Sequence, residues 1–191
     1  TDNKKASVVI TGIGNYKGTT FAEFNITPRS LSDGNVNTTT IPNQQYTGLE
    51  IKPDANVVVT DGTKILTLGV DYQIGYSNNI NVGEVALVVI TGIGNYTGTV
   101  NRTFVIVARN ISEHANEFEI VINDMTFTGR QIRPSYDDFT LKFNGTALDN
   151  NRSIYAFANS NAFGENINVG KGSFVIEGNG NFTGLLTFNF N

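Results

Sequence analysis

The feature that most constrains the fold is an internal repeat. Residues 8–18 read Val-Val-Ile-Thr-Gly-Ile-Gly-Asn-Tyr-Lys-Gly, and this pattern returns nearly unchanged at 88–98 and more loosely at 174–184. Two further patterns recur between these copies. Aromatic-Thr-Gly-x-x-Ile-x-Pro begins at Tyr46 and again at Phe127. Because several markers recur in one order, we expect one structural unit to be repeated along the chain.

The third marker, Asn-Ile-Asn-Val-Gly, occupies 79–83 and 166–170. Together the markers predict two units of about 80 residues, which we call repeat A (29–108) and repeat B (109–191). Residues 1–28, the N-terminal segment, match only the closing third of a unit. We therefore interpret this segment as the closing strands of a preceding repeat.

The segments between markers predict an all-β fold. They are short, rich in β-branched and aromatic residues, and separated by Gly, Asn, Asp and Pro, as is typical of strands. No stretch shows apolar residues at helical spacing with caps, and 111–122 is the only one for which a helix is an alternative. We expect tandem β-sandwich units of immunoglobulin-like type, and helix-free β-grasp-like units are the alternative. The predicted strands are 57–59, 72–76, 85–91, 104–107, 118–122, 139–143 and 185–190.

The recurring glycine motif is interpreted as a turn between two strands. Glycine adopts positive φ at little steric cost, and asparagine tolerates the same region. A dinucleotide fingerprint is excluded, since the glycine spacing is one residue too wide and a strand follows where a helix is needed. The candidate residues are Gly12, Gly14, Asn15 and Tyr16, then Gly92, Gly94, Asn95 and Tyr96, then Gly178, Gly180, Asn181 and Phe182.

The aromatic residues of the motifs keep their ring but not their hydroxyl. Tyr16 and Tyr96 correspond to Phe182, and Tyr46 corresponds to Phe127. A catalytic tyrosine could not lose its oxygen, whereas a ring that closes a core could. We therefore assign these five rings to packing.

Composition removes most catalytic schemes. There is no cysteine and one histidine, His114, so disulfides, thiolate sites and multi-histidine metal sites lack their residues. Charged residues make up 16% and the net charge is −4, which gives no footprint for nucleic acid. No apolar run approaches the length of a membrane span. We expect no enzyme activity, no cofactor and no metal, and we interpret the Asn-x-Asn-x-Gly marker as a solvated turn rather than a calcium loop.

Repeat B contains a longer loop than repeat A. The additional residues fall around 158–164, Ala-Asn-Ser-Asn-Ala-Phe-Gly. Loops of this kind carry binding residues in many proteins. Phe163 is therefore the candidate ligand contact under the alternative that the chain is a glycan- or protein-binding module.

The order of motifs resembles a known family. Tyr-Thr-Gly-x-x-Ile-x-Pro, then Asp71-Tyr72-x-Ile-x-Tyr, then Val-x-Ile-Thr-Gly-x-Gly-Asn-Tyr-x-Gly-Thr is similar to tandem bacterial Ig-like or MBG-type repeats of large Firmicutes cell-surface proteins. The resemblance is close over 46–106 and looser over 109–191. It implies secretion, attachment to the bacterial surface or wall elsewhere in the parent protein, and a stalk or adhesin role.

The two unit boundaries have equal length. Phe24 precedes Arg29 by the same spacing as Phe104 precedes Arg109, with no Gly/Ser linker between units. We expect successive repeats to hold a fixed angle, as in a stiff rod. The expected function is an extracellular structural spacer, with other repeats of the same protein as partners. Donation of strands 1–28 between subunits would instead build a surface filament.

Overall fold

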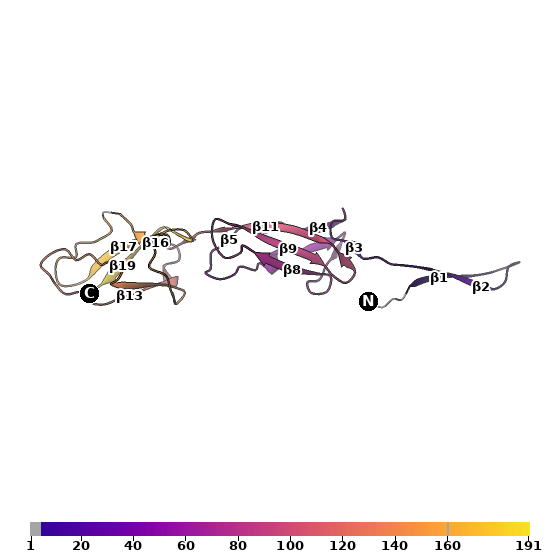
Figure 1. Ribbon diagram of the computed structural model, residues 1–191, viewed down its shortest axis with the longest axis horizontal. Helices are drawn as coiled ribbons and strands as arrows, with labels where there is room; N and C mark the ends of the chain where they lie inside the picture. The colour runs from indigo at the N-terminus through magenta and orange to yellow at the C-terminus, as the bar shows by residue number, and fades with distance from the viewer. Residues whose placement is uncertain (1–4, 160) are drawn as a thin grey trace. The chain divides into compact units, whose positions relative to one another are not determined.

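The computed structural model describes residues 5–159 and 161–191, and its regular structure is almost entirely β (Figure 1). In these residues the only helical segments are two three-residue 3-10 turns, η1 (Asp54–Asn56) and η2 (Ala115–Glu117). The predicted all-β class is confirmed, and 111–122 contains a strand rather than an α-helix. The first four residues of the N-terminal segment and Ser160 of the long loop lie outside the described residues.

Most predicted strands occur near their expected bounds. Two differ in where they start: η1 precedes a strand that begins only at Val59, and the strand expected at 104–107 begins earlier, at Thr99. Apolar residues at every second position explain why these segments form strands, since successive side chains of a strand point to opposite faces. In β9 (Val85–Gly92), Ala86, Val88 and Ile90 point inward and are fully buried.

The chain divides into two compact units. Unit 1 comprises Thr1–Thr40, Asp54–Gly75 and Val88–Arg102, and unit 2 comprises Ile41–Pro53, Tyr76–Leu87 and Thr103–Asn191. Repeat A contributes residues to both units, whereas all of repeat B lies in unit 2. Three strands, β8 (Tyr72–Ser77), β9 and β11 (Thr99–Val107), contain residues of both units; with β5 (Gln44–Gln45) they form a sheet in the order β5-β11-β9-β8.

Unit 1 contains three small sheets. An antiparallel hairpin joins β1 (Ala6–Thr11) to β2 (Thr19–Phe24). A three-stranded meander runs β4 (Val36–Thr38), β6 (Val59–Asp61), β7 (Lys64–Ile65). The two-residue strand β3 (Arg29–Ser30) pairs in parallel with β10 (Tyr96–Thr97).

Unit 2 contains the same kinds of sheet within repeat B. A meander runs β13 (Phe118–Ile122), β14 (Phe139–Phe143), β15 (Thr146–Ala147). A second sheet has the order β16 (Tyr155–Phe157), β17 (Gly172–Gly178), β19 (Leu185–Phe190). The short strands β12 (Arg109–Asn110) and β18 (Phe182–Thr183) pair in parallel. Repeats A and B therefore share the meander, the parallel two-residue pair and an antiparallel sheet, in the same order along the chain. They differ in that β5 of repeat A has no counterpart among the described strands of repeat B, and in the places of η1 and η2.

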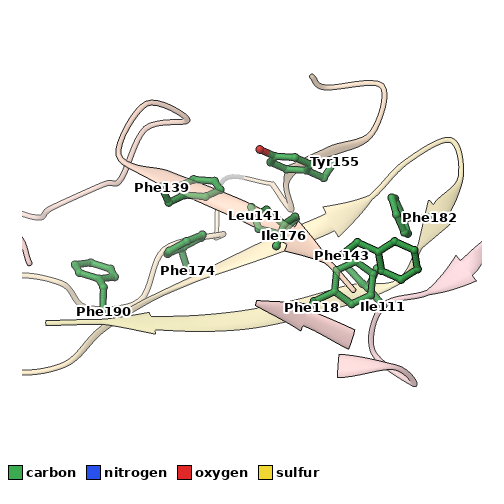
Figure 2. Packing of buried hydrophobic residues seen from close by; sticks show 10 residues of the cluster. All are labelled: Ile111, Phe118, Phe139, Leu141, Phe143, Tyr155, Phe174, Ile176, Phe182 and Phe190. Atoms are coloured by element: carbon green, nitrogen blue, oxygen red, sulfur yellow. The ribbon is translucent and has the colours of Figure 1, made fainter. Parts of the chain in front are cut away.

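The core of repeat B lies between its two three-stranded sheets. Phe139, Leu141 and Phe143 come from β14, and Phe174 and Ile176 from β17. Figure 2 shows these side chains gathered between the strands, with Phe118, Phe143 and Phe182 together at one end of the cluster. Phe190 lies at the other end, with its ring centroid 6.2 Å from that of Phe174. Packing is dominated by aromatic rings, each of which removes a large apolar area from water.

Candidate functional site at the junction between repeats

The glycine motif forms the same turn in all three copies. The first glycine donates its backbone N–H to the carbonyl of the glycine six residues on, at 2.9 Å from Gly12 and Gly92 and at 3.0 Å from Gly178. In each copy the second glycine of the motif has a positive φ, between 62° and 66°. A Cβ on Gly92 would lie 2.6 Å from the backbone nitrogen of Thr97, which explains why glycine is required there.

The aromatic residue after each turn occupies an equivalent place in repeats A and B. Tyr96 begins β10 and Phe182 begins β18, and each pairs with the first arginine of its repeat, Arg29 or Arg109. Both rings are buried, with 7% and 4% exposed. The corresponding Tyr16 in the hairpin is 79% exposed, so the prediction that this ring packs into a core is wrong: β1 and β2 form a two-stranded sheet, and no described residue covers the ring.

Tyr46 of repeat A packs against the aromatic end of the repeat B core. Its ring centroid lies 5.3 Å from that of Phe182 in an edge-to-face arrangement and 6.1 Å from that of Phe143 in a stacked one. Phe118 completes the group, 5.0 Å from Phe143. All four residues belong to unit 2. Such ring pairs contribute roughly 0.5–1.5 kcal/mol beyond the burial of their area. The sequence predicted Tyr46 and Phe182 as packing residues but did not predict that they meet each other.

Asparagine side chains add hydrogen bonds at the same place. The backbone N–H of Val82 donates to Oδ1 of Asn181 at 2.8 Å, and the amide nitrogen of Asn181 donates to Oδ1 of Asn81 at 3.0 Å. Asn181 is the asparagine of the glycine motif in repeat B, while Asn81 and Val82 belong to the third marker in repeat A. Two sequence markers that looked independent therefore bind one another.

Arg109 connects three segments of unit 2. Its guanidinium donates to the side-chain oxygen of Gln45 and, in a bidentate arrangement, to both carboxylate oxygens of Glu117. The Glu117 side chain is only 18% exposed. The hydrogen bond from Arg109 lowers the pKa of Glu117 below its usual value, since it stabilises the charged carboxylate. Nδ1 of His114 lies 3.6 Å from the same carboxylate.

The matching end of repeat A, which lies in unit 1, is polar instead of aromatic. Asp61 precedes the two-residue loop of the β6–β7 hairpin, as Phe143 does in the β14–β15 hairpin. Asp61 accepts a hydrogen bond from the Tyr96 hydroxyl at 3.2 Å and forms an ion pair with Arg29 at 3.1 Å. Nζ of Lys64 lies 5.2 Å from the centre of the Tyr96 ring. Repeat A therefore has a carboxylate, Asp61, where repeat B has the ring of Phe143, although both ends keep an arginine ion pair, Arg29–Asp61 in one and Arg109–Glu117 in the other.

The prediction that the third marker is a solvated turn is wrong for its first asparagine. Asn79 is 4% exposed and Asn166 is 5% exposed. Each side chain donates to the carbonyl of the isoleucine of its repeat's Ile-x-Pro segment, Asn79 to Ile51 at 3.0 Å and Asn166 to Ile132 at 3.1 Å. The backbone oxygens of both asparagines accept from the N–H groups of the same isoleucines. The recurrence of this asparagine was the available signal, but its hydrogen-bond partner lies too far along the chain to be inferred.

Phe127 and Phe163 have different environments. Phe127, the counterpart of Tyr46, is 55% exposed, so the prediction that it packs is wrong: among the described residues no rings lie against it as Phe143 and Phe182 lie against Tyr46. Phe163 is half-buried, with its ring centroid 4.9 Å from that of Phe157 and with the Arg133 guanidinium 5.6 Å from its centre. The ring of Phe163 thus contacts the core and a cation of its own repeat, which leaves less of it for a ligand than the sequence suggested.

Comparisons with known proteins add no relative. No protein-family model matches the chain, and searches of curated proteins and of solved structures find no match. Among residues 5–159 and 161–191 there is no cluster of three or more His, Cys, Asp or Glu side chains placed to hold a metal ion. The same residues include no helix long and apolar enough to cross a membrane. The ring contacts and hydrogen bonds described above hold segments of repeat A and repeat B against one another within unit 2.

Proposed function

We propose that the chain is part of an extracellular structural spacer: tandem β-sandwich repeats that form a stalk of a bacterial surface protein or adhesin, or build a surface filament. The repeats are each other's partners, and the chain has no catalytic role in this proposal. The resemblance to tandem Firmicutes surface repeats supports the cell-surface location. The shared strand order of repeats A and B supports the repeat assignment.

The observation that carries the proposal is the direct connection between the repeats. Strand β11 ends at Val107 and β12 begins at Arg109, so a single residue, Ala108, separates them. The same place is filled by the Tyr46, Phe143 and Phe182 rings and by the Asn81–Asn181 hydrogen bond. A flexible linker would leave the modules free to rotate, whereas a packed connection restricts them. A spacer requires this restriction.

Small-angle X-ray scattering tests the proposal. We expect the chain to scatter as an elongated particle whose maximum dimension is set by repeats placed end to end. The matched comparison is a variant with a Gly-Ser-Gly-Ser insertion after Ala108, which keeps both repeats and loosens only their connection. The insertion should broaden the distance distribution. A compact particle, or a wild-type profile as broad as that of the insertion variant, would contradict the spacer proposal.

Binding of a glycan or host protein through the long loop is the second candidate from the sequence. No contact of the described residues favours it, because Phe163 packs within its own repeat. A glycan array on the intact chain, with Phe163→Ala as the comparison, tests this alternative: selective binding that the substitution abolishes would establish it.

A further inference from the structure

The exposed end of repeat B is a shallow apolar surface. Phe127 is 55% exposed, Val169 is 89% exposed and Ile167 is 44% exposed. Phe127 and Val169 line a cavity of about 360 Å³ together with Met125, Ile132 and Phe190. Apolar side chains gathered around a hollow in this way are typical of an interaction surface.

The corresponding surface of repeat A is already occupied. Tyr46 stands where Phe127 stands, and the turn around the two residues is the same. Thr47 Oγ1 donates to the carbonyl of Leu49 at 3.2 Å, and Thr128 Oγ1 donates to that of Arg130 at 3.2 Å. Tyr46, however, is covered by Phe143 and Phe182 of repeat B.

The other contact residues are also matched. Asn168 and Val169 hold the positions of Asn81 and Val82, which bind Asn181. Met125 donates its backbone N–H to Asn191 at 2.8 Å, at the position where Gln44 lies beside β11. The end of repeat B therefore presents the half of the junction that repeat A contributes, including an exposed Asn168.

The chemistry of the surface selects the occupant. The end that covers Tyr46 is aromatic, with Phe118, Phe143 and Phe182. The equivalent end of repeat A carries the Asp61–Arg29 ion pair and Lys64. Lys171 lines the same cavity, so placing Arg29 and Lys64 there would bring like charges together and would also remove them from water, which is costly. The end of repeat B also carries an ion pair, Arg109–Glu117, but this pair is already accommodated beside Tyr46, where Arg109 donates to Gln45 as well. Its three aromatic rings add no further charge to be buried.

We propose that the surface around Phe127 is a docking site for a further module with the aromatic end of repeat B, joined in tandem, and not for a module with the charged end of repeat A. The inference rests on the proposed function, because it extends the same kind of junction by one step. It also sets the order of the tandem modules, because the charged or aromatic side chains at the end of a module decide which module it can follow.

Two extended chains test this selectivity. One carries a second copy of residues 106–191 after Asn191, and the other carries residues 26–108 there. Each added segment then begins two residues after Phe190, as 106 follows Phe104 and 26 follows Phe24. The sequence contains no tryptophan, so Phe127→Trp places a single fluorophore on the surface. We expect acrylamide to quench this fluorophore several-fold less in the chain with the second repeat B than in the unextended chain. The chain with the additional repeat A should give little protection.

Tyr46→Trp in the unextended chain separates the two proposals. If the tryptophan introduced at position 46 is shielded but the one at position 127 stays accessible beside the added repeat B, the docking inference is overturned while the spacer proposal stands. If the fluorophore at position 46 is itself freely quenched, the spacer proposal falls with the docking inference. Equal protection of position 127 by both extensions would overturn the selectivity.

A second measurement needs no substitution. The Tyr46 backbone N–H donates to Val107 at 3.0 Å, and the Phe127 amide should gain the equivalent partner in the chain with the second repeat B. Hydrogen exchange of the Phe127 amide should therefore slow several-fold in that chain. Unchanged exchange would overturn the inference even if the tryptophan variants failed to fold.

Discussion

At the scale of single residues, equivalent positions in the two repeats change together. The hydroxyl of Tyr96 donates to Asp61. In repeat B the two equivalent positions are both phenylalanine, Phe182 and Phe143, and their rings contact each other. The tyrosine hydroxyl is therefore dispensable only where the carboxylate that accepts its hydrogen bond is absent too. A buried hydroxyl without a partner would cost free energy, so the pair is exchanged as a unit.

The buried asparagines should matter more than their exposed neighbours. The Asn166 side chain donates to Ile132 and Ser173 and accepts from the Ser173 N–H. Asn166→Ala leaves these backbone groups without their partner, which we expect to lower the free energy of unfolding by roughly 2 kcal/mol or more. Urea denaturation measures the loss. Asn168→Ala, at an exposed position of the same marker, is the control and should change stability by less than about 0.5 kcal/mol. Equal effects would show that burial of Asn166 is not what matters.

At the scale of secondary structure elements, the long strands were predictable and the short ones were not. Strands such as β9 and β14 alternate inward and outward residues, which the sequence pattern reveals directly. The parallel pairs β3–β10 and β12–β18 join residues far apart in the chain, and two residues carry no periodicity. For the same reason the sequence located the Tyr46 and Phe182 rings in packed positions without predicting their mutual contact.

The connection between β12 and η2 should respond to acid. Because the pKa of Glu117 is lowered in the folded chain from a usual value of 4.5, its contribution to stability is complete above that pH. The contribution is lost as the pH falls through the lower pKa of the folded state. Urea unfolding between pH 7 and pH 3 should therefore show a smaller acid loss for Glu117→Gln than for the wild type.

Arg109 is the first cause of the lowered pKa and provides the control. In an Arg109→Met background, replacing Glu117 by Gln should leave the acid slope nearly unchanged. If Glu117→Gln altered the slope equally in both backgrounds, the bidentate contact would not be the origin of the pH dependence.

At the scale of the whole molecule, the proposed spacer is a chain to which similar repeats are added one after another. Each repeat contributes an apolar core, mostly aliphatic in repeat A and mostly aromatic in repeat B, together with a glycine turn and two ends. Unit 2 includes a contact between the ends of successive repeats. The N-terminal hairpin has the same glycine turn but exposes its apolar residues, among them Val9 at 62% and Phe21 at 67%. The counterpart of Val9 in repeat A, Val89, is half-buried, and its neighbour Val88 is fully buried. The rest of a repeat thus covers the apolar side chains of its closing strands, which are exposed in the hairpin and buried or half-buried in β9.

Residual dipolar couplings from one aligned sample show whether repeats A and B are rigidly joined. Backbone N–H couplings can be fitted separately for residues 29–108 and 109–191. If the packed junction holds the two repeats at one angle, as proposed, their alignment tensors will be equal in magnitude and orientation. Tensors that differ clearly in magnitude would show independent reorientation and would contradict a spacer built from rigidly joined modules.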